Sequence, residues 1–137
     1  IKSRGFYEVV DEIKRQDGLV ILPHPYSRHK GVIEDLAKCA DVIEAMNGRC
    51  SHAKNVKAFR LARNLGKSVI ACSDAHFAFE IGCLKTKFYS SASSPEGLRK
   101  EILNCKRELV GKESPLLVHE LTFAIEILKR VTGLCRG

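Results

Sequence analysis

Apolar and polar positions follow two periods along this chain, one typical of helices and one typical of strands. The apolar residues between Phe6 and Ile13 recur at three- and four-residue spacing, and Gly18 follows a charged stretch, so a first helix is predicted to end near residue 16. Short apolar runs and one alternating segment then indicate strands. Strands are predicted at 19–22, 41–46, 68–72 and 84–89.

Amphipathic segments with start and stop signals lie between and after these strands. A short helix is predicted at 32–37, and a basic helix capped by Ser51 and closed at Gly66 follows. Ser93 to Glu96 is a strong helix start, because serine caps, proline suits the first turn and glutamate favours the positive end of the helix dipole. The apolar stripe of that helix is Leu98, Ile102, Cys105 and Leu109, and the helix is predicted to stop near Gly111. The last helix is predicted from Ser114 to Gly133.

Helices and strands therefore alternate along most of the chain. This order predicts an α/β fold with a mostly parallel sheet, since the central strands are too apolar to face water on either side. No linker or repeat divides the sequence, so residues 1–137 are expected to form a single domain. In this organisation 1–111 holds the βα units and 112–137 the C-terminal helix.

Polar side chains suited to metal binding follow the first three predicted strands. His24, between two prolines, follows the first strand, and Asn47 ends the second. Asp74 and His76 follow the third, and residues two apart in an extended segment point to the same side. Because the carboxyl ends of parallel strands are where α/β folds place their ligands, these residues are expected to converge.

The charge and the cysteine content give weaker indications of the partners and the location of the protein. The formal net charge of +7 favours anionic partners such as phosphates or nucleic acid, although the basic residues are spread along helices as on ordinary solvated faces. The six cysteines include no close pair, which favours reduced thiols, and Cys72 is expected in the core. The sequence shows neither a membrane-spanning run nor a secretion leader, so a cytoplasmic location is expected.

Three segments together resemble a known family. They are Leu22-Pro23-His24-Pro25-Tyr26, then 41–47, and Ser73-Asp74-Ala75-His76 with Glu80-Ile81-Gly82 behind it. In this order they resemble the third and fourth motifs of the PHP (polymerase and histidinol phosphatase) superfamily of metal-dependent phosphoesterases. The region after Met46 is also similar to the PHP-associated C-terminal segment, and the resemblance covers roughly residues 5 to 90.

The resemblance implies a fold, a chemistry and a ligand set. The fold is a distorted seven-stranded TIM-like barrel, of which this chain would be the C-terminal portion. His24, Asp74 and His76 carry over as ligands of divalent ions, zinc, manganese or iron, with Asp74 and His76 at the centre of catalysis. The other ligands of the family precede the position of His24 and are not in this sequence. Incomplete metal occupancy and little turnover are therefore expected of these 137 residues alone.

Further side chains in the strand-end loops have supporting roles in this interpretation. Arg28, His29, Arg49 and His52 are predicted to contact a phosphorylated small molecule or nucleic acid substrate. Asn47 and Glu80 are expected to hydrogen-bond the ligands rather than to bind metal. His119, in the last helix, is interpreted as a surface or packing histidine.

A second hypothesis belongs to a different class of protein. The positive charge and the missing ligands also fit a catalytically silent basic module that binds nucleic acid, or a subunit that completes its barrel with a partner chain. The partner would be a second copy or a missing N-terminal half, because unpaired apolar strand edges drive association. No membrane partner is expected.

Overall fold

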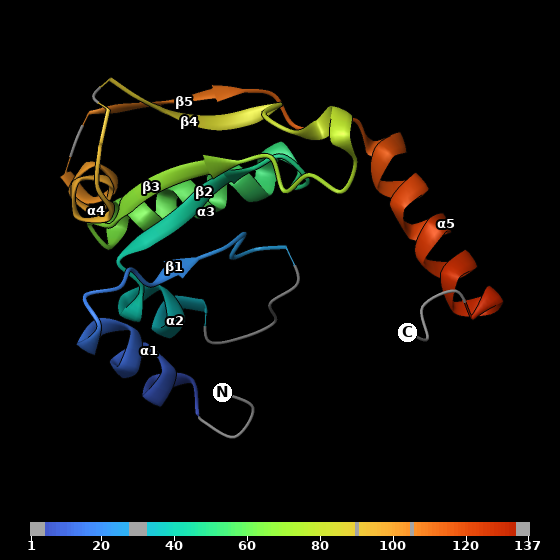
Figure 1. Ribbon diagram of the computed structural model, residues 1–137. Coiled ribbons are helices and arrows are strands. Elements are labelled where there is room, and N and C mark those ends of the chain that lie inside the picture. The colour runs from blue at the N-terminus through green and yellow to red at the C-terminus, as the bar shows by residue number, and fades with distance from the viewer. Residues whose placement is uncertain (1–4, 28–32, 90, 105, 134–137) are drawn as a thin grey trace.

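The computed structural model describes residues 5–27, 33–89, 91–104 and 106–133. Its helices alternate with parallel and antiparallel strands, which confirms the predicted α/β class (Figure 1). The elements in chain order are α1 (Phe6–Arg15), β1 (Ile21–Leu22), α2 (Ile33–Cys39), β2 (Val42–Asn47), α3 (His52–Asn64), β3 (Ser68–Cys72), the 3-10 helix η1 (Ala78–Glu80), β4 (Leu84–Phe88), α4 (Pro95–Asn104), β5 (Arg107–Gly111) and α5 (Leu116–Thr132).

The main sheet contains β1, β2 and β3, paired in parallel in that order. The register between β2 and β3 shifts between Glu44 and Met46, which marks a β-bulge in β2. Within the described residues this sheet is open and is not a closed barrel. The partial barrel implied by the family resemblance therefore stays a prediction.

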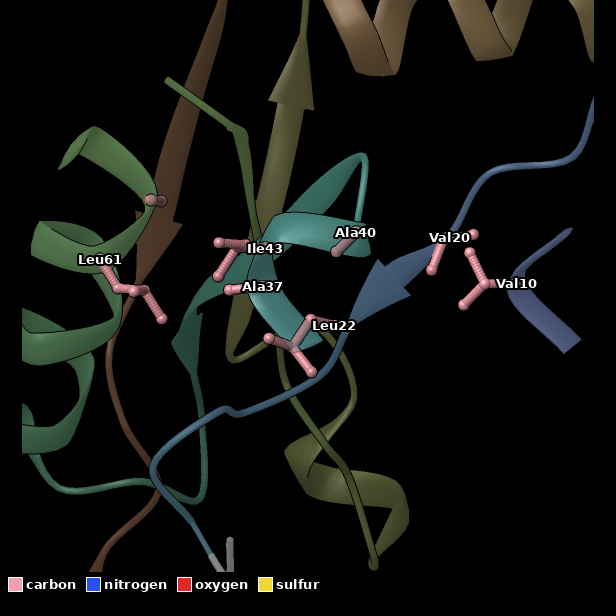
Figure 2. Close-up of a cluster of buried hydrophobic side chains, with 8 residues drawn as sticks. Val10, Val20, Leu22, Ala37, Ala40, Ile43 and Leu61 are labelled. Atoms are coloured by element: carbon pink, nitrogen blue, oxygen red, sulfur yellow. The ribbon is translucent and has the colours of Figure 1, made fainter. Parts of the chain in front are cut away.

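The apolar core lies between the main sheet and the first three helices. Val10 of α1, Leu22 of β1 and Ile43 of β2 pack with residues of α2 and α3 (Figure 2). Nearly every side chain of β2 is buried, as expected for a central parallel strand covered on both faces. The buried cluster consists of Val10, Val20, Leu22, Ala37, Ala40, Ile43, Leu61 and Ala62.

The second sheet corrects the prediction of a helix reaching Leu109. α4 ends at Asn104, and 107–111 forms β5, antiparallel to β4. Tertiary contacts explain the difference, because the β4–β5 ribbon docks against β3. The Thr86 hydroxyl donates to the Ala71 carbonyl oxygen (3.0 Å) and accepts from the Ala71 N–H (2.8 Å), so a side chain of the ribbon satisfies the backbone of β3.

α5 is the last element and leaves many apolar side chains in solvent. The strands of the main sheet point toward the side of the molecule where α5 lies (Figure 1). Leu117, Leu121, Phe123, Leu128 and Val131 of α5 are all exposed. Across the described part of the chain, no helix combines the length and apolar character that a bilayer crossing requires.

Candidate functional site

The carboxyl ends of the parallel strands border a pocket of about 370 Å³. His24 reaches it from the loop after β1, and Asp74 and His76 reach it from the loop after β3. α5 supplies further lining, so the pocket joins segments far apart in the sequence. The lining residues are His24, Ser27, Arg49, Asp74, His76, His119, Thr122 and Phe123. The structure thus brings together all three residues predicted from sequence as metal ligands.

Two of these three residues have an unusual backbone conformation. The φ angle is 23° at His24 and 51° at Asp74, in the left-handed region that residues other than glycine rarely adopt. The N–H of His24 donates a 2.6 Å hydrogen bond to Oε2 of Glu44, which helps to hold the loop in place. Such strain, about 1–3 kcal/mol per residue, clusters at functional sites. Both strand ends are therefore shaped to present a side chain.

Asn47 connects the loops around the pocket and is almost fully buried. Its Nδ2 donates to Oε1 of Glu44 (3.0 Å) and to Oδ2 of Asp74 (3.2 Å). Its Oδ1 accepts from the Arg49 N–H (2.8 Å), and its backbone N–H donates to Oδ1 of Asn55 (3.0 Å). Asn47 thus orients the Asp74 carboxylate.

The hydrogen bond from Asn47 to Glu44 depends on the bulge in β2. On a regular strand, side chains three residues apart point to opposite faces. The register shift between Glu44 and Met46 adds a residue to β2 and brings the two side chains together. Glu44 is buried and also accepts a hydrogen bond from the N–H of His24. Sequence reasoning assigned Glu44 no role, because a glutamate in an apolar strand carries no signal of what it will contact.

The contacts of His76 select its tautomer. Nδ1 of His76 lies 2.8 Å from the backbone carbonyl oxygen of Asp74. A carbonyl oxygen only accepts hydrogen bonds, so Nδ1 carries the hydrogen and the neutral ring has its lone pair on Nε2. Metal-binding histidines are commonly fixed in this way, with the second nitrogen donating to a carbonyl or carboxylate. The geometry of His76 therefore suits a metal ligand.

Glu80 and Arg49 form a buried ion pair beside the pocket. Nη1 of Arg49 donates to both carboxylate oxygens of Glu80, at 2.9 and 3.1 Å, and Glu80 is only 2% exposed. Burial by itself raises the pKa of Glu80. The backbone N–H groups of His76 and Phe77, the Ser114 hydroxyl and the Arg49 charge outweigh it and lower the pKa to about 2. Glu80 thus stays ionised and holds the backbone that carries His76.

Arg49 also reaches α5. Its Nη2 donates to Oγ1 of Thr122 at 2.7 Å, and the Thr122 hydroxyl donates to the Val118 carbonyl oxygen at 2.9 Å. Arg49 was predicted to contact substrate phosphate. It does line the pocket, but its guanidinium already bonds Glu80 and Thr122. The structure therefore shows Arg49 as a tie between the loop after β2, η1 and α5.

His119 lies in the pocket, whereas the sequence pattern indicated a surface or packing histidine. Its Nε2 is buried and has no hydrogen-bond partner among the described residues. Burial lowers the pKa of His119, and the charge of Arg49 lowers it further, against the opposing effects of Glu80 and Asp74. The helical pattern around His119 gave no signal of this role, because the pocket depends on how α5 docks.

Gly48 lies where the loops after β2 and β3 come close together. A Cβ at Gly48 would overlap the carbonyl oxygen of Ser73, so only glycine lets the loops after β2 and β3 approach this closely.

Cys72 was expected in the core but is exposed. Partial burial of its thiol, together with the Glu44 carboxylate, raises the pKa of Cys72 to about 11, so the thiol stays protonated at neutral pH.

The remaining predicted substrate contacts are not in the pocket or are not described. The His52 side chain is 84% exposed and lies 3.6 Å from Glu113, and His52 is not part of the pocket lining. Arg28 and His29 fall outside the described residues.

The predicted ligands share a pocket but do not converge on one point. Across residues 5–27, 33–89, 91–104 and 106–133, no three His, Cys, Asp or Glu side chains form a group that could hold a metal ion. His24, Asp74 and His76 still provide imidazole and carboxylate donors, the chemistry that suits zinc, manganese or iron.

Comparison with known proteins finds a family match for part of the chain. Residues 52–106 match the family described as PHP-associated. An uncharacterized protein of Methanocaldococcus jannaschii is 33% identical over 127 residues, which cover 81% of this chain and 54% of the relative. The chain thus spans about half the length of the curated relative it matches. No solved structure matches the chain.

Proposed function

We propose that this chain, which carries the PHP-associated C-terminal segment of a PHP superfamily protein, is part of a metal-dependent phosphoesterase. One observation carries the proposal: His24, Asp74 and His76 line a single pocket at the carboxyl ends of parallel strands. The proposed reaction is hydrolysis of a phosphate ester in a small molecule or a nucleic acid.

The donor atoms around the pocket are of the kinds that bind a divalent ion. His76 keeps its Nε2 lone pair because Nδ1 donates to the Asp74 carbonyl oxygen, and Asn47 orients the Asp74 carboxylate. A divalent ion bound there would supply a water of lowered pKa and would neutralise charge on the phosphate oxygens. Glu44 and Glu80 hold the backbone N–H groups of His24 and His76, so both strand-end loops are fixed by buried carboxylates.

This chain would supply only part of the complete site. It offers three ligands of the kind that the family uses, and it spans about half of its relative. The remaining ligands would come from a PHP portion outside these 137 residues, on the same polypeptide or on a partner chain. We therefore expect low metal affinity and little turnover from this chain by itself.

Asp74→Asn in the natural polypeptide that contains this chain tests the proposal. The change keeps the shape of the side chain but removes its charge. We expect loss of bound zinc, manganese or iron by elemental analysis, and a fall of about 100-fold or more in hydrolysis of p-nitrophenyl phosphate or its bis-ester. Asp35→Asn, on the exposed face of α2, is the matched control and should leave both measurements unchanged.

Two results would contradict the proposal. One is a wild-type protein, expressed with each metal supplied, that binds no divalent ion. The other is an Asp74→Asn protein that hydrolyses both esters at the wild-type rate.

A further inference from the structure

We propose that His119 contacts the phosphate group of the substrate from α5, across the pocket from the strand-end loops. This inference rests on the proposed function and assigns a substrate-contact residue to a helix outside the PHP-associated match at 52–106.

The first step of the argument is the position of the imidazole. His119 lines the same pocket as His24, Asp74 and His76, although it lies 43 or more positions from each of them in the sequence. Its Nε2 is shielded from water and has no hydrogen-bond partner among the described residues. A buried polar atom left in this way is unfavourable, and a ligand in the pocket would satisfy it.

The second step is that the neighbouring polar groups on this wall are already engaged. The Thr122 hydroxyl donates to the Val118 carbonyl oxygen and accepts from Nη2 of Arg49. Nη1 of Arg49 also donates to both carboxylate oxygens of Glu80, and this ion pair offsets the charge of Arg49. Within the described part of α5, His119 is therefore the polar pocket-lining residue whose ring nitrogen can still form a hydrogen bond to a ligand.

The third step separates a phosphate contact from a metal ligand. His119 reaches the pocket from α5, whereas Asp74 and His76 reach it from the loop after β3, so His119 faces the proposed ion site from another wall. The pocket of about 370 Å³ leaves room for a phosphate group between the two walls. Burial favours the neutral imidazole, which donates one hydrogen bond and accepts another, and an arriving phosphate oxygen would accept the donated one.

The experiment compares His119→Ala, His119→Gln and the control Glu120→Ala in the natural polypeptide that contains this chain. Glu120 is the next residue of α5 and is exposed. Three measurements are made on each protein: bound metal by elemental analysis, the dissociation constant of inorganic phosphate by calorimetry, and the steady-state kinetics (KM and kcat) of p-nitrophenyl phosphate hydrolysis. Circular dichroism checks that each variant is folded.

We expect His119→Ala to weaken phosphate binding and raise KM by about tenfold or more, with metal content unchanged. In His119→Gln the side-chain amide can still donate a hydrogen bond, so this variant should bind phosphate more tightly and show a lower KM than His119→Ala. His119→Gln also provides the test if the alanine variant is poorly folded. Glu120→Ala should behave as wild type.

Other outcomes would overturn the inference. Unchanged phosphate affinity in both His119 variants would show that the side chain does not touch the phosphate. Loss of metal in His119→Ala would make His119 a metal ligand instead. If the wild-type protein binds neither metal nor phosphate, the proposed function fails and this inference fails with it. If wild type binds both and the variants match it, the inference fails and the proposed function stands.

Discussion

The two halves of the molecule are stabilised in different ways. Residues 6–72 contain the parallel sheet and an apolar core that α1, α2 and α3 cover. Residues 78–132 contain the β4–β5 ribbon, α4 and α5, and α5 exposes Leu117, Phe123 and Val131 to solvent. The first half is held by burial of apolar surface, whereas the second half is attached to the first through many polar contacts. The pocket lies where the two halves meet.

Hydrogen bonds constrain the relative orientation of the two groups that they join, because they depend on angle as well as distance. The Thr86 hydroxyl bonds both backbone groups of Ala71, and Nη1 of Arg107 donates to Oγ of Ser68 and to the Val69 carbonyl oxygen (3.2 Å). Arg49 bonds Glu80 and Thr122 in the same manner. The C-terminal half therefore has a defined placement on the sheet, and α5 is aimed at the pocket even though much of its apolar surface is uncovered.

The largest loss of stability is expected from replacing Arg49, whose hydrogen bonds link the two halves. Arg49→Met should lower the free energy of unfolding by about 3–5 kcal/mol, because it leaves the Glu80 carboxylate buried without its charged partner. The loss of the bond to Thr122 should also let α5 move away from the pocket. Urea unfolding measures the first effect, and the rate of proteolytic cleavage within α5 measures the second.

The matched control for that tie is an exposed ion pair. Arg15→Met removes the pairing with Glu12 on the surface of α1 and should leave the free energy of unfolding close to that of wild type. If Arg49→Met were as mild as Arg15→Met, with no change in α5 cleavage, the polar attachment of the C-terminal half would be disproved.

The second prediction compares apolar side chains in the two halves directly. Ile43 is 0% exposed in the core, and Ile43→Ala should destabilise the protein by about 2–5 kcal/mol because it leaves a cavity. Leu128 of α5 is 61% exposed, and Leu128→Ala should change stability by less than about 0.5 kcal/mol. Urea denaturation of both variants gives the two values. A large loss for Leu128→Ala would mean that something covers α5 in solution.

The third prediction concerns pH and the attachment through Glu80. The pKa of Glu80 is lowered in the folded protein to about 2 from an ordinary value of 4.5, so its ionised form stabilises the fold above about pH 4.5. This contribution, on the order of 3 kcal/mol, is lost progressively as the pH falls toward 2.

Glu80→Gln is the variant that isolates this effect. The stability gap between wild type and Glu80→Gln should narrow as urea unfolding is repeated from about pH 6 down to about pH 3. Glu120→Gln, on the exposed face of α5, serves as the control for carboxylates in general. A gap that stays constant over this range would show that Glu80 does not titrate with a lowered pKa.

Sequence patterns predicted the N-terminal half better than the C-terminal half. The apolar runs before His24, Asn47 and Asp74 are strong signals, because a strand buried on both faces needs nearly continuous apolar residues. β5 was missed because the stripe from Leu98 continues to Leu109 without a helix-stopping residue, and pairing with β4 decides the structure there.

The candidate site divides in the same way. His24, Asp74 and His76 were predicted from local motifs, and they do line one pocket. The roles of Glu44 and His119 depend on long-range geometry, that is, on the bulge in β2 and on the docking of α5. No local pattern encodes such contacts, since each needs a partner far away in the sequence or an irregularity in a strand.

The bulge in β2 also determines the direction of a side chain in the site. The extra residue between Glu44 and Met46 decides which face of the sheet Asn47 points to, and Asn47 bonds both Glu44 and Asp74. If Ala45 were accommodated in a regular strand without the bulge, every side chain of the pocket would be kept, yet Asn47 would turn to the face opposite Glu44. In this protein the irregularity of one strand is thus as much a part of the site as the identity of its residues, and relatives need to be compared by both.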